Sequence, residues 1–135
     1  MIVVDTNVIG YLFLSSEQAL SAEQALKKDS EWAAPLLWRS EFRNVLALYL
    51  RKKYLTLQQA QSTMNSALEV MRGREYDVSS YEVLRLASTS KCSAYDCEFI
   101  VAANDLQVRL VTVDTQLLRE FPTVAVSLNS FIEHQ

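Results

Sequence analysis

Hydrophobic and polar positions follow two different periods along this chain. Short apolar runs rich in β-branched residues, such as Ile2-Val3-Val4, are typical of strands buried on both faces. Longer segments, such as residues 17–28, place apolar residues three and four positions apart, as an amphipathic helix does. Because the strand-like runs are separated by helical segments, the pattern predicts a mainly parallel sheet with right-handed crossovers.

The expected elements fill most of the chain. The predicted strands are residues 2–5, 32–34, 76–78, 109–113 and 124–126. The predicted helices are residues 7–14, 17–28, 36–53, 57–72, 80–86, 94–106, 115–120 and 130–134. The helices of residues 36–72 form a long hairpin beside the sheet. We therefore expect an α/β fold, a three-layer α/β/α sandwich with a protruding helical hairpin, and the strand order stays open.

Composition narrows the class of protein. The 135 residues are half hydrophobic with only 2 Gly and 2 Pro, which predicts one folded domain over residues 1–135 rather than a disordered chain. A net charge of −3 argues against a general nucleic-acid coat but not against a nuclease. The two cysteines, Cys92 and Cys97, are too few for a disulfide scaffold. No segment has the length of a membrane span or the pattern of a signal peptide, so we expect a soluble cytoplasmic protein without membrane association.

Two aspartates come directly at the ends of predicted strands. Asp5 follows Ile2-Val3-Val4, and Asp114 follows Leu110-Val111-Thr112-Val113. A helical segment comes after each aspartate, and Thr6 and Asn7 offer side-chain oxygens suited to a helix start. Open α/β sheets bind their ligands at the carboxyl ends of the strands. The two aspartates therefore predict a metal site at that edge.

Two further acids stand near the beginnings of helices. Glu41 lies among apolar neighbours early in the helix of residues 36–53, and Asp96 lies in the first turn of a very apolar helix. Each has a purely structural alternative: an ion pair with Arg39 or Arg43 for Glu41, and a favourable helix dipole for Asp96. The functional interpretation rests on the convergence of all four acids, because two strand ends and two helix beginnings can meet at one edge of a parallel sheet. Glu98, two residues beyond Asp96, points to another face of its helix.

Four short motifs carry a family resemblance that covers the whole chain. In chain order they are Asp5-Thr6-Asn7, Ser40-Glu41-Phe42-x-Asn44-Val45-Leu46, Tyr95-Asp96 before an apolar helix, and Thr112-x-Asp114. Together they resemble the motif set of the PIN-domain ribonucleases, and most closely that of the VapC-type toxins of bacterial toxin–antitoxin pairs. The resemblance implies that the catalytic and metal-binding acids are Asp5, Glu41, Asp96 and Asp114. It also implies that the residues supporting the metal site are Thr6, Asn7 and Thr112.

The resemblance implies a Mg²⁺-dependent endoribonuclease in which Mn²⁺ substitutes for Mg²⁺. Carboxylate oxygens select these hard cations, which ease deprotonation of a bound water and neutralise charge on a scissile phosphate. The implied partners are a cognate antitoxin, an RNA substrate and a second copy of the chain. Arg39 and Arg43 flank Glu41 and are candidate RNA contacts. The cluster Arg51-Lys52-Lys53, followed by Tyr54, is interpreted first as a solvated helix end.

Two other functions stay open. The first is a housekeeping PIN nuclease without an antitoxin. The second is a non-catalytic Mg²⁺-binding α/β signalling module, which would need a lysine at a late strand end where this chain has Asp114. Other nuclease chemistries are disfavoured, because the only histidine is His134 and the two glycines, Gly10 and Gly73, form no phosphate loop.

Overall fold

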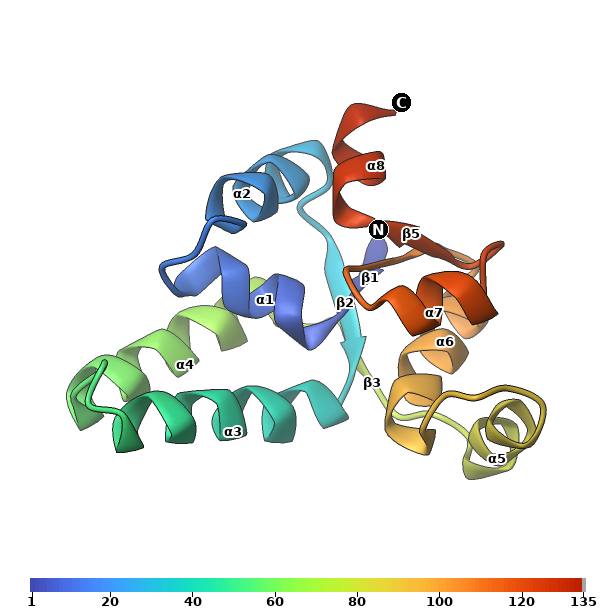
Figure 1. Cartoon of the computed structure of the whole chain (residues 1–135), viewed down its shortest axis with the longest axis horizontal. Helices are drawn as coiled ribbons and strands as arrows, with labels where there is room; N and C mark the ends of the chain where they lie inside the picture. The colour runs from blue at the N-terminus through green and yellow to red at the C-terminus, as the bar shows by residue number, and fades with distance from the viewer. Residues whose placement is uncertain (135) are drawn as a thin grey trace.

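A five-stranded parallel sheet forms the middle of the molecule in the computed structural model, which describes residues 1–134 (Figure 1). The strands are β1 (Ile2–Val4), β2 (Trp32–Pro35), β3 (Glu75–Tyr76), β4 (Leu110–Thr112) and β5 (Ala125–Ser127). Their order is β3-β2-β1-β4-β5, so β1 lies at the centre, with Val3 opposite both Ala33 and Leu110. Because all four neighbouring pairs are parallel, every strand ends at the same edge.

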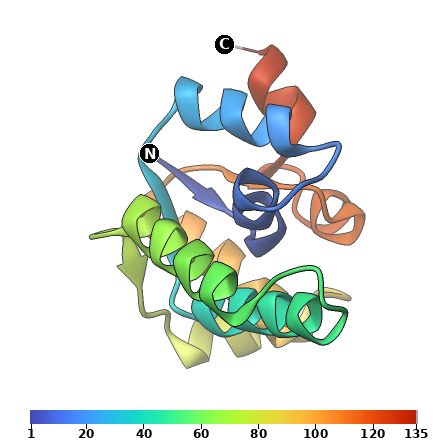
Figure 2. The ribbon, with the colours of Figure 1, turned by 90° about the vertical axis from the view of Figure 1, so that its left-hand side faces the viewer.

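Helices cover both faces of this sheet (Figures 1 and 2). They are α1 (Thr6–Phe13), α2 (Ala19–Lys28), α3 (Leu37–Arg51), α4 (Leu57–Met71), α5 (Ser80–Ser88), α6 (Ala94–Leu106), α7 (Thr115–Glu120) and α8 (Leu128–Glu133). Helix α6 packs across β1, β2 and β4 with α5 beside it, and α1 lies on the opposite face. The predicted three-layer α/β/α sandwich is confirmed. None of the helices in residues 1–134 combines the length and apolar character needed to cross a membrane.

The predicted helical hairpin is formed by α3 and α4, which extend side by side away from the sheet (Figure 1). Lys53 makes the turn between them in a left-handed conformation with φ 61°. Thr56 then begins α4 with a capping box, in which its hydroxyl and the side chain of Gln59 each accept a backbone N–H. Gly73 follows α4 with φ +79°, a conformation that favours glycine. Helix α1 packs against both arms and holds the hairpin beside the strand ends.

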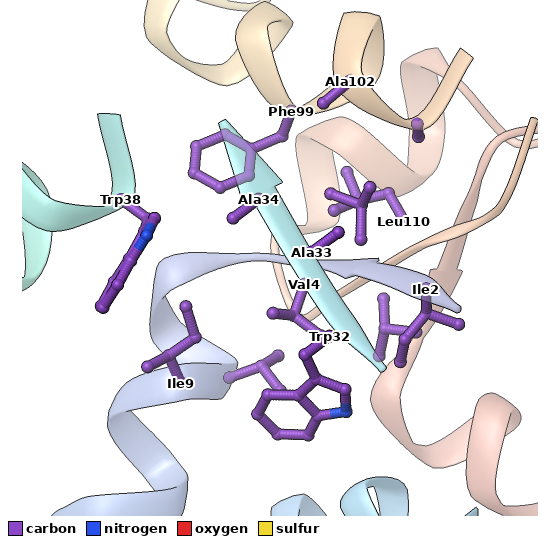
Figure 3. Close-up of a cluster of buried hydrophobic side chains, with 14 of the residues drawn as sticks. Ile2, Val4, Ile9, Trp32, Ala33, Ala34, Trp38, Phe99, Ala102 and Leu110 are labelled. Carbon is purple, nitrogen blue, oxygen red and sulfur yellow. The ribbon is translucent and has the colours of Figure 1, made fainter. Parts of the chain in front are cut away.

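The core fills the spaces between these layers (Figure 3). Phe99 and Ala102 of α6 contact one face of the sheet, and Ile9 of α1 lies on the other face near Trp32. Trp32 and Trp38 are fully buried, as expected for residues in apolar segments. Their burial supports a structural role for both rings rather than a role in stacking on a substrate.

A few element boundaries differ from the sequence prediction for local reasons. The extended piece expected at residues 76–78 is β3 at Glu75–Tyr76, because Glu75 pairs with Ala34 at the end of β2. The last helix begins at Leu128 rather than residue 130, because the hydroxyl of Ser127 caps it by accepting the N–H of Ser130. These shifts do not move any of the four candidate acids.

Candidate metal centre

Asp5 and Asp114 end neighbouring strands and also begin the helices that follow. The Asp5 carboxylate accepts the N–H of Asn7 at 3.0 Å, and Asp114 Oδ1 accepts the N–H groups of Gln116 and Leu117 at 2.8 and 3.0 Å. The N-cap of α1 is therefore Asp5 itself, and not Thr6 or Asn7 as the sequence suggested. This double use of each aspartate, as strand end and helix cap, fixes both carboxylates at the same edge of the sheet.

Two buried threonine hydroxyls connect these acids to one another. Thr112 donates a 2.6 Å hydrogen bond to Asp5 Oδ2 and accepts the backbone N–H of Asp114 at 3.0 Å. Thr6 donates a 2.6 Å hydrogen bond to Glu41 Oε1, which joins α1 to α3. The threonines therefore orient Asp5 and Glu41 with neutral donors and leave the negative charges in place.

All four candidate acids line one pocket of about 260 Å³. The strand ends supply Asp5 and Asp114, α3 supplies Glu41, and the first turn of α6 supplies Asp96, where Ser93 is the N-cap. Asn7 lies at the same pocket, as expected. Thr112 does not line the pocket but donates a hydrogen bond to Asp5, which does.

Asn44 also lines this pocket, although no role was predicted for it from the sequence. It lies three residues after Glu41 on α3, and residues at that spacing share a helix face. Once Glu41 is assigned to the site, its three-residue spacing from Asn44 is enough to predict from the sequence that Asn44 lies there too.

Burial and mutual repulsion act on the acids together. Burial, followed by the charge of Asp114, raises the pKa of Asp5 despite the hydrogen bond from Thr112. Burial and the charges of Asp5 and Asp96 raise the pKa of Glu41, and burial and the charges of Asp114 and Asp5 raise that of Asp96. Raised carboxyl pKa values are expected where acids crowd together without a cation among them.

The donor set fits a hard divalent cation. Within residues 1–134 none of the four acids forms a salt bridge. In the same part of the chain, no three acidic, histidine or cysteine side chains are close enough to hold one ion jointly. Mg²⁺ commonly takes only one or two protein carboxylates and keeps several waters, which suits this spacing.

The two arginines near Glu41 are turned to other partners. Arg39 forms a two-pronged ion pair with Glu75, at 2.6 Å from Nε and 2.5 Å from Nη2, and Trp38 Nε1 donates to the same carboxylate at 2.7 Å. Arg43 donates from Nε to the carbonyl of Arg39 at 3.0 Å. Neither arginine lines the acidic pocket, so the ion-pair alternative for Glu41 has no support here. RNA contact by either arginine stays a prediction.

Glu98 lies outside the acidic pocket and lines a neighbouring cavity with residues of α5. Its charge is nevertheless near enough to contribute to the raised pKa of Glu41. Glu98 and Asp96 are two residues apart on α6, and this separation places them on different faces of the helix.

Comparison with known proteins identifies a family. Residues 2–122 match the family model of the PIN domain. Ribonuclease VapC3 of Pyrobaculum aerophilum is 28% identical over 128 residues, which cover 91% of this chain and 96% of that protein. The fold resembles a toxin–antitoxin complex from Klebsiella pneumoniae, with TM-score 0.71, 23% identity, and 95% of this chain and 98% of that chain covered. It also resembles PAE2754 from Pyrobaculum aerophilum, with TM-score 0.76, 20% identity, and 98% and 86% covered. The chain belongs to the PIN-domain family.

Proposed function

We propose that this protein is a divalent-metal-dependent endoribonuclease of the VapC type, the toxin of a toxin–antitoxin pair. The observation that carries the proposal is the gathering of Asp5, Glu41, Asp96 and Asp114 around one pocket at the carboxyl edge of the sheet. The similarity to a protein named Ribonuclease VapC3 supports RNA as the substrate.

The acidic pocket would hold Mg²⁺ through one or two of its carboxylates and through waters that the ion keeps, with Mn²⁺ as a substitute. When bound, such an ion favours deprotonation of a water and neutralises charge on the scissile phosphate. The protein's own contribution is positional. Thr112 and Thr6 fix the carboxylates of Asp5 and Glu41, and the amide of Asn44 can donate a hydrogen bond to a phosphate oxygen at the pocket.

The proposed protein partner is a cognate antitoxin. One structural relative is described as a toxin–antitoxin complex, and the proposal extends that kind of assembly to this chain, together with a homodimer. A pocket with four acids and no basic side chain attracts a cation. We expect an arginine or lysine of the antitoxin to reach Asp5 or Asp96 and compete with the metal.

Substitution of the acids tests the proposed catalysis directly. Asp5→Asn, Asp96→Asn and Asp114→Asn should each lower RNA cleavage by at least roughly 100-fold, as removal of a group acting on the transition state does. Asp105→Asn is the matched control, because Asp105 is an exposed acid on the same helix as Asp96. Circular dichroism checks that each variant is folded. If any two of the three pocket variants cleave at the wild-type rate, the assignment of these acids is wrong.

A growth assay separates a toxin from a housekeeping PIN nuclease. Expression of the wild type alone should arrest bacterial growth, and Asp5→Ala should relieve the arrest while the protein remains soluble. Normal growth with soluble, nuclease-active wild type would favour the housekeeping alternative.

A further inference from the structure

A second cavity, of about 130 Å³, opens directly beside the acidic pocket. The two share three lining residues, namely Thr6, Asn7 and Val45. The second cavity differs in chemistry, because its other walls include the rings of Tyr11 and Tyr49 and no charged side chain. A molecule that reaches the four acids therefore has an uncharged, aromatic space next to it. We call this space the tyrosine cavity.

Helix α3 joins the acidic pocket to the tyrosine cavity along one face. Glu41, Val45 and Tyr49 follow each other at four-residue spacing, so they lie in line on the helix. The rise of 1.5 Å per residue places Tyr49 about 12 Å beyond Glu41 along the axis. The exposed side chains of Lys52 and Lys53 follow at the end of the helix. Along α3, the acidic pocket is therefore followed by the tyrosine cavity and then by the cationic end of the helix.

The walls of the tyrosine cavity carry hydrogen-bonding groups with no partner. Within residues 1–134 the side-chain amide of Asn7 and the hydroxyls of Tyr11 and Tyr49 make no hydrogen bond. The ring of Tyr49 packs edge-on against that of Tyr54, with centroids 5.7 Å apart and an angle of 84°.

Gly10 forms part of the lining, and packing does not require a glycine there. A Cβ atom on Gly10 would lie 3.8 Å from Phe42 and 4.0 Å from Leu14, which are ordinary contacts. A glycine inside a helix destabilises it relative to alanine, because the unfolded chain has more freedom. The absence of a Cβ atom at Gly10 leaves more room in the tyrosine cavity.

We propose that the tyrosine cavity binds one nucleobase of a single-stranded RNA whose neighbouring phosphate lies at the four acids. The inference rests on the proposed ribonuclease function and extends it to a base-binding subsite. A nucleobase has a flat apolar face for a tyrosine ring and a polar edge for an amide and hydroxyls. The lysines at the end of α3 then lie where the strand continues, and they attract its phosphates.

The free polar groups favour a base over an apolar side chain of a protein partner. A leucine or phenylalanine in the tyrosine cavity would offer no hydrogen bond to the polar side chains of Asn7, Tyr11 and Tyr49. The base satisfies these groups and stacks at the same time. Binding of an antitoxin side chain is therefore the competing outcome of the test.

The test measures binding of a short fluorescein-labelled RNA by fluorescence anisotropy, with Ca²⁺ in place of Mg²⁺ to limit cleavage. Tyr49→Ala should weaken binding roughly five- to hundredfold, the range for loss of one base–aromatic stack. Tyr49→Phe keeps the ring and should stay close to wild type. Tyr81→Ala is the matched control, because Tyr81 is an 80% exposed tyrosine on α5 that does not line the tyrosine cavity.

RNAs with a single abasic position locate the bound base. At one position the abasic RNA should bind wild type and Tyr49→Ala equally, because the stack is already absent, and at other positions the difference should persist. Gly10→Ala gives a second reading if Tyr49→Ala does not fold. It should raise the melting temperature and lower RNA affinity together, because it strengthens α1 and narrows the tyrosine cavity.

The possible results distinguish failure of the base subsite from failure of the proposed nuclease function. Wild-type RNA affinity in Tyr49→Ala and Gly10→Ala, or an equal loss at every abasic position, would overturn the base subsite while cleavage by wild type still supports the nuclease. The base subsite is also overturned if both variants bind RNA normally and instead release the antitoxin. Tyrosine-dependent binding without any cleavage in Mg²⁺ or Mn²⁺ would keep the subsite and refute the nuclease. Absence of RNA binding by wild type would refute both.

Discussion

The hydroxyl of Thr112 offers the sharpest measurable consequence of the site's construction. Thr112 is fully buried, donates to Asp5 Oδ2 at 2.6 Å and accepts the N–H of Asp114 at 3.0 Å. Thr112→Val keeps the shape of the side chain and removes both hydrogen bonds. A hydrogen bond to a charged group contributes about 1.5–3 kcal/mol, and an unsatisfied buried N–H costs about 1–3 kcal/mol. Burial of the methyl group that replaces the hydroxyl stabilises the folded state by about 0.8 kcal/mol.

The net expectation is a loss of about 2–5 kcal/mol in the free energy of unfolding at neutral pH. For a domain of this size that loss lowers the melting temperature by roughly 6–25 °C. Urea titration followed by circular dichroism measures it in the metal-free protein. Thr63→Val is the control, because the Thr63 hydroxyl donates to the carbonyl of Gln59 on the exposed surface of α4. Its effect should stay within about 0.5 kcal/mol.

The pH dependence of this loss adds a second check. The hydrogen bond from Thr112 favours the ionised form of Asp5, whose pKa is raised overall by burial. Thr112→Val raises the pKa of Asp5 further, so the charge-assisted part of the loss is complete above the variant's pKa and shrinks as the pH falls from there to the wild-type value. A Thr112→Val loss no larger than that of Thr63→Val, or one that grows toward acid pH, would refute the reasoning.

Two further predictions concern the repulsion among the acids. Burial, Asp114 and Asp5 raise the folded-state pKa of Asp96, so the folded state holds its proton more tightly and stability falls as the pH rises from the unfolded value, about 3.9, through the raised one. Urea titrations in EDTA should find Asp96→Asn more stable than wild type above that window and equal to it at acid pH. Mn²⁺ at about ten times its Kd should stabilise wild type by about 1.4 kcal/mol, or roughly 3–6 °C by calorimetry. NaCl of equal ionic strength should not do so, and an equal Mn²⁺ response in Asp96→Asn would contradict the site.

The sequence was sufficient for the parts of the site that depend on local structure. Each strand–Asp–helix segment places its aspartate where a strand ends and a helix begins, which is why Asp5 and Asp114 could be located before any contact was known. Parallel strands then bring these ends to one edge. The order of the strands was not predictable, because it depends on which helices pack on which face.

The parts that were not predicted depend on contacts between distant residues. An ion pair between Arg39 and Glu41 was one alternative, but Glu75, 36 residues after Arg39, holds the guanidinium. Glu75 has that position because β3 pairs with β2, a long-range pairing of two very short strands. The hydrogen bond from Thr112 to Asp5 spans 107 residues and likewise has no local signal.

The choice of partners around the acids explains how the pocket remains ready for a cation. Asp5 and Glu41 are held by the hydroxyls of Thr112 and Thr6, which orient the carboxylates without neutralising them. A guanidinium in the same place would relieve the repulsion and stabilise the metal-free fold, but it would occupy the position of the metal. Arg39, two residues before Glu41 in the sequence, is instead bound in an ion pair with Glu75. The metal-free protein therefore keeps an uncompensated negative charge, and in the proposed function the charge that would bind Mg²⁺ would equally attract a single basic side chain of the antitoxin.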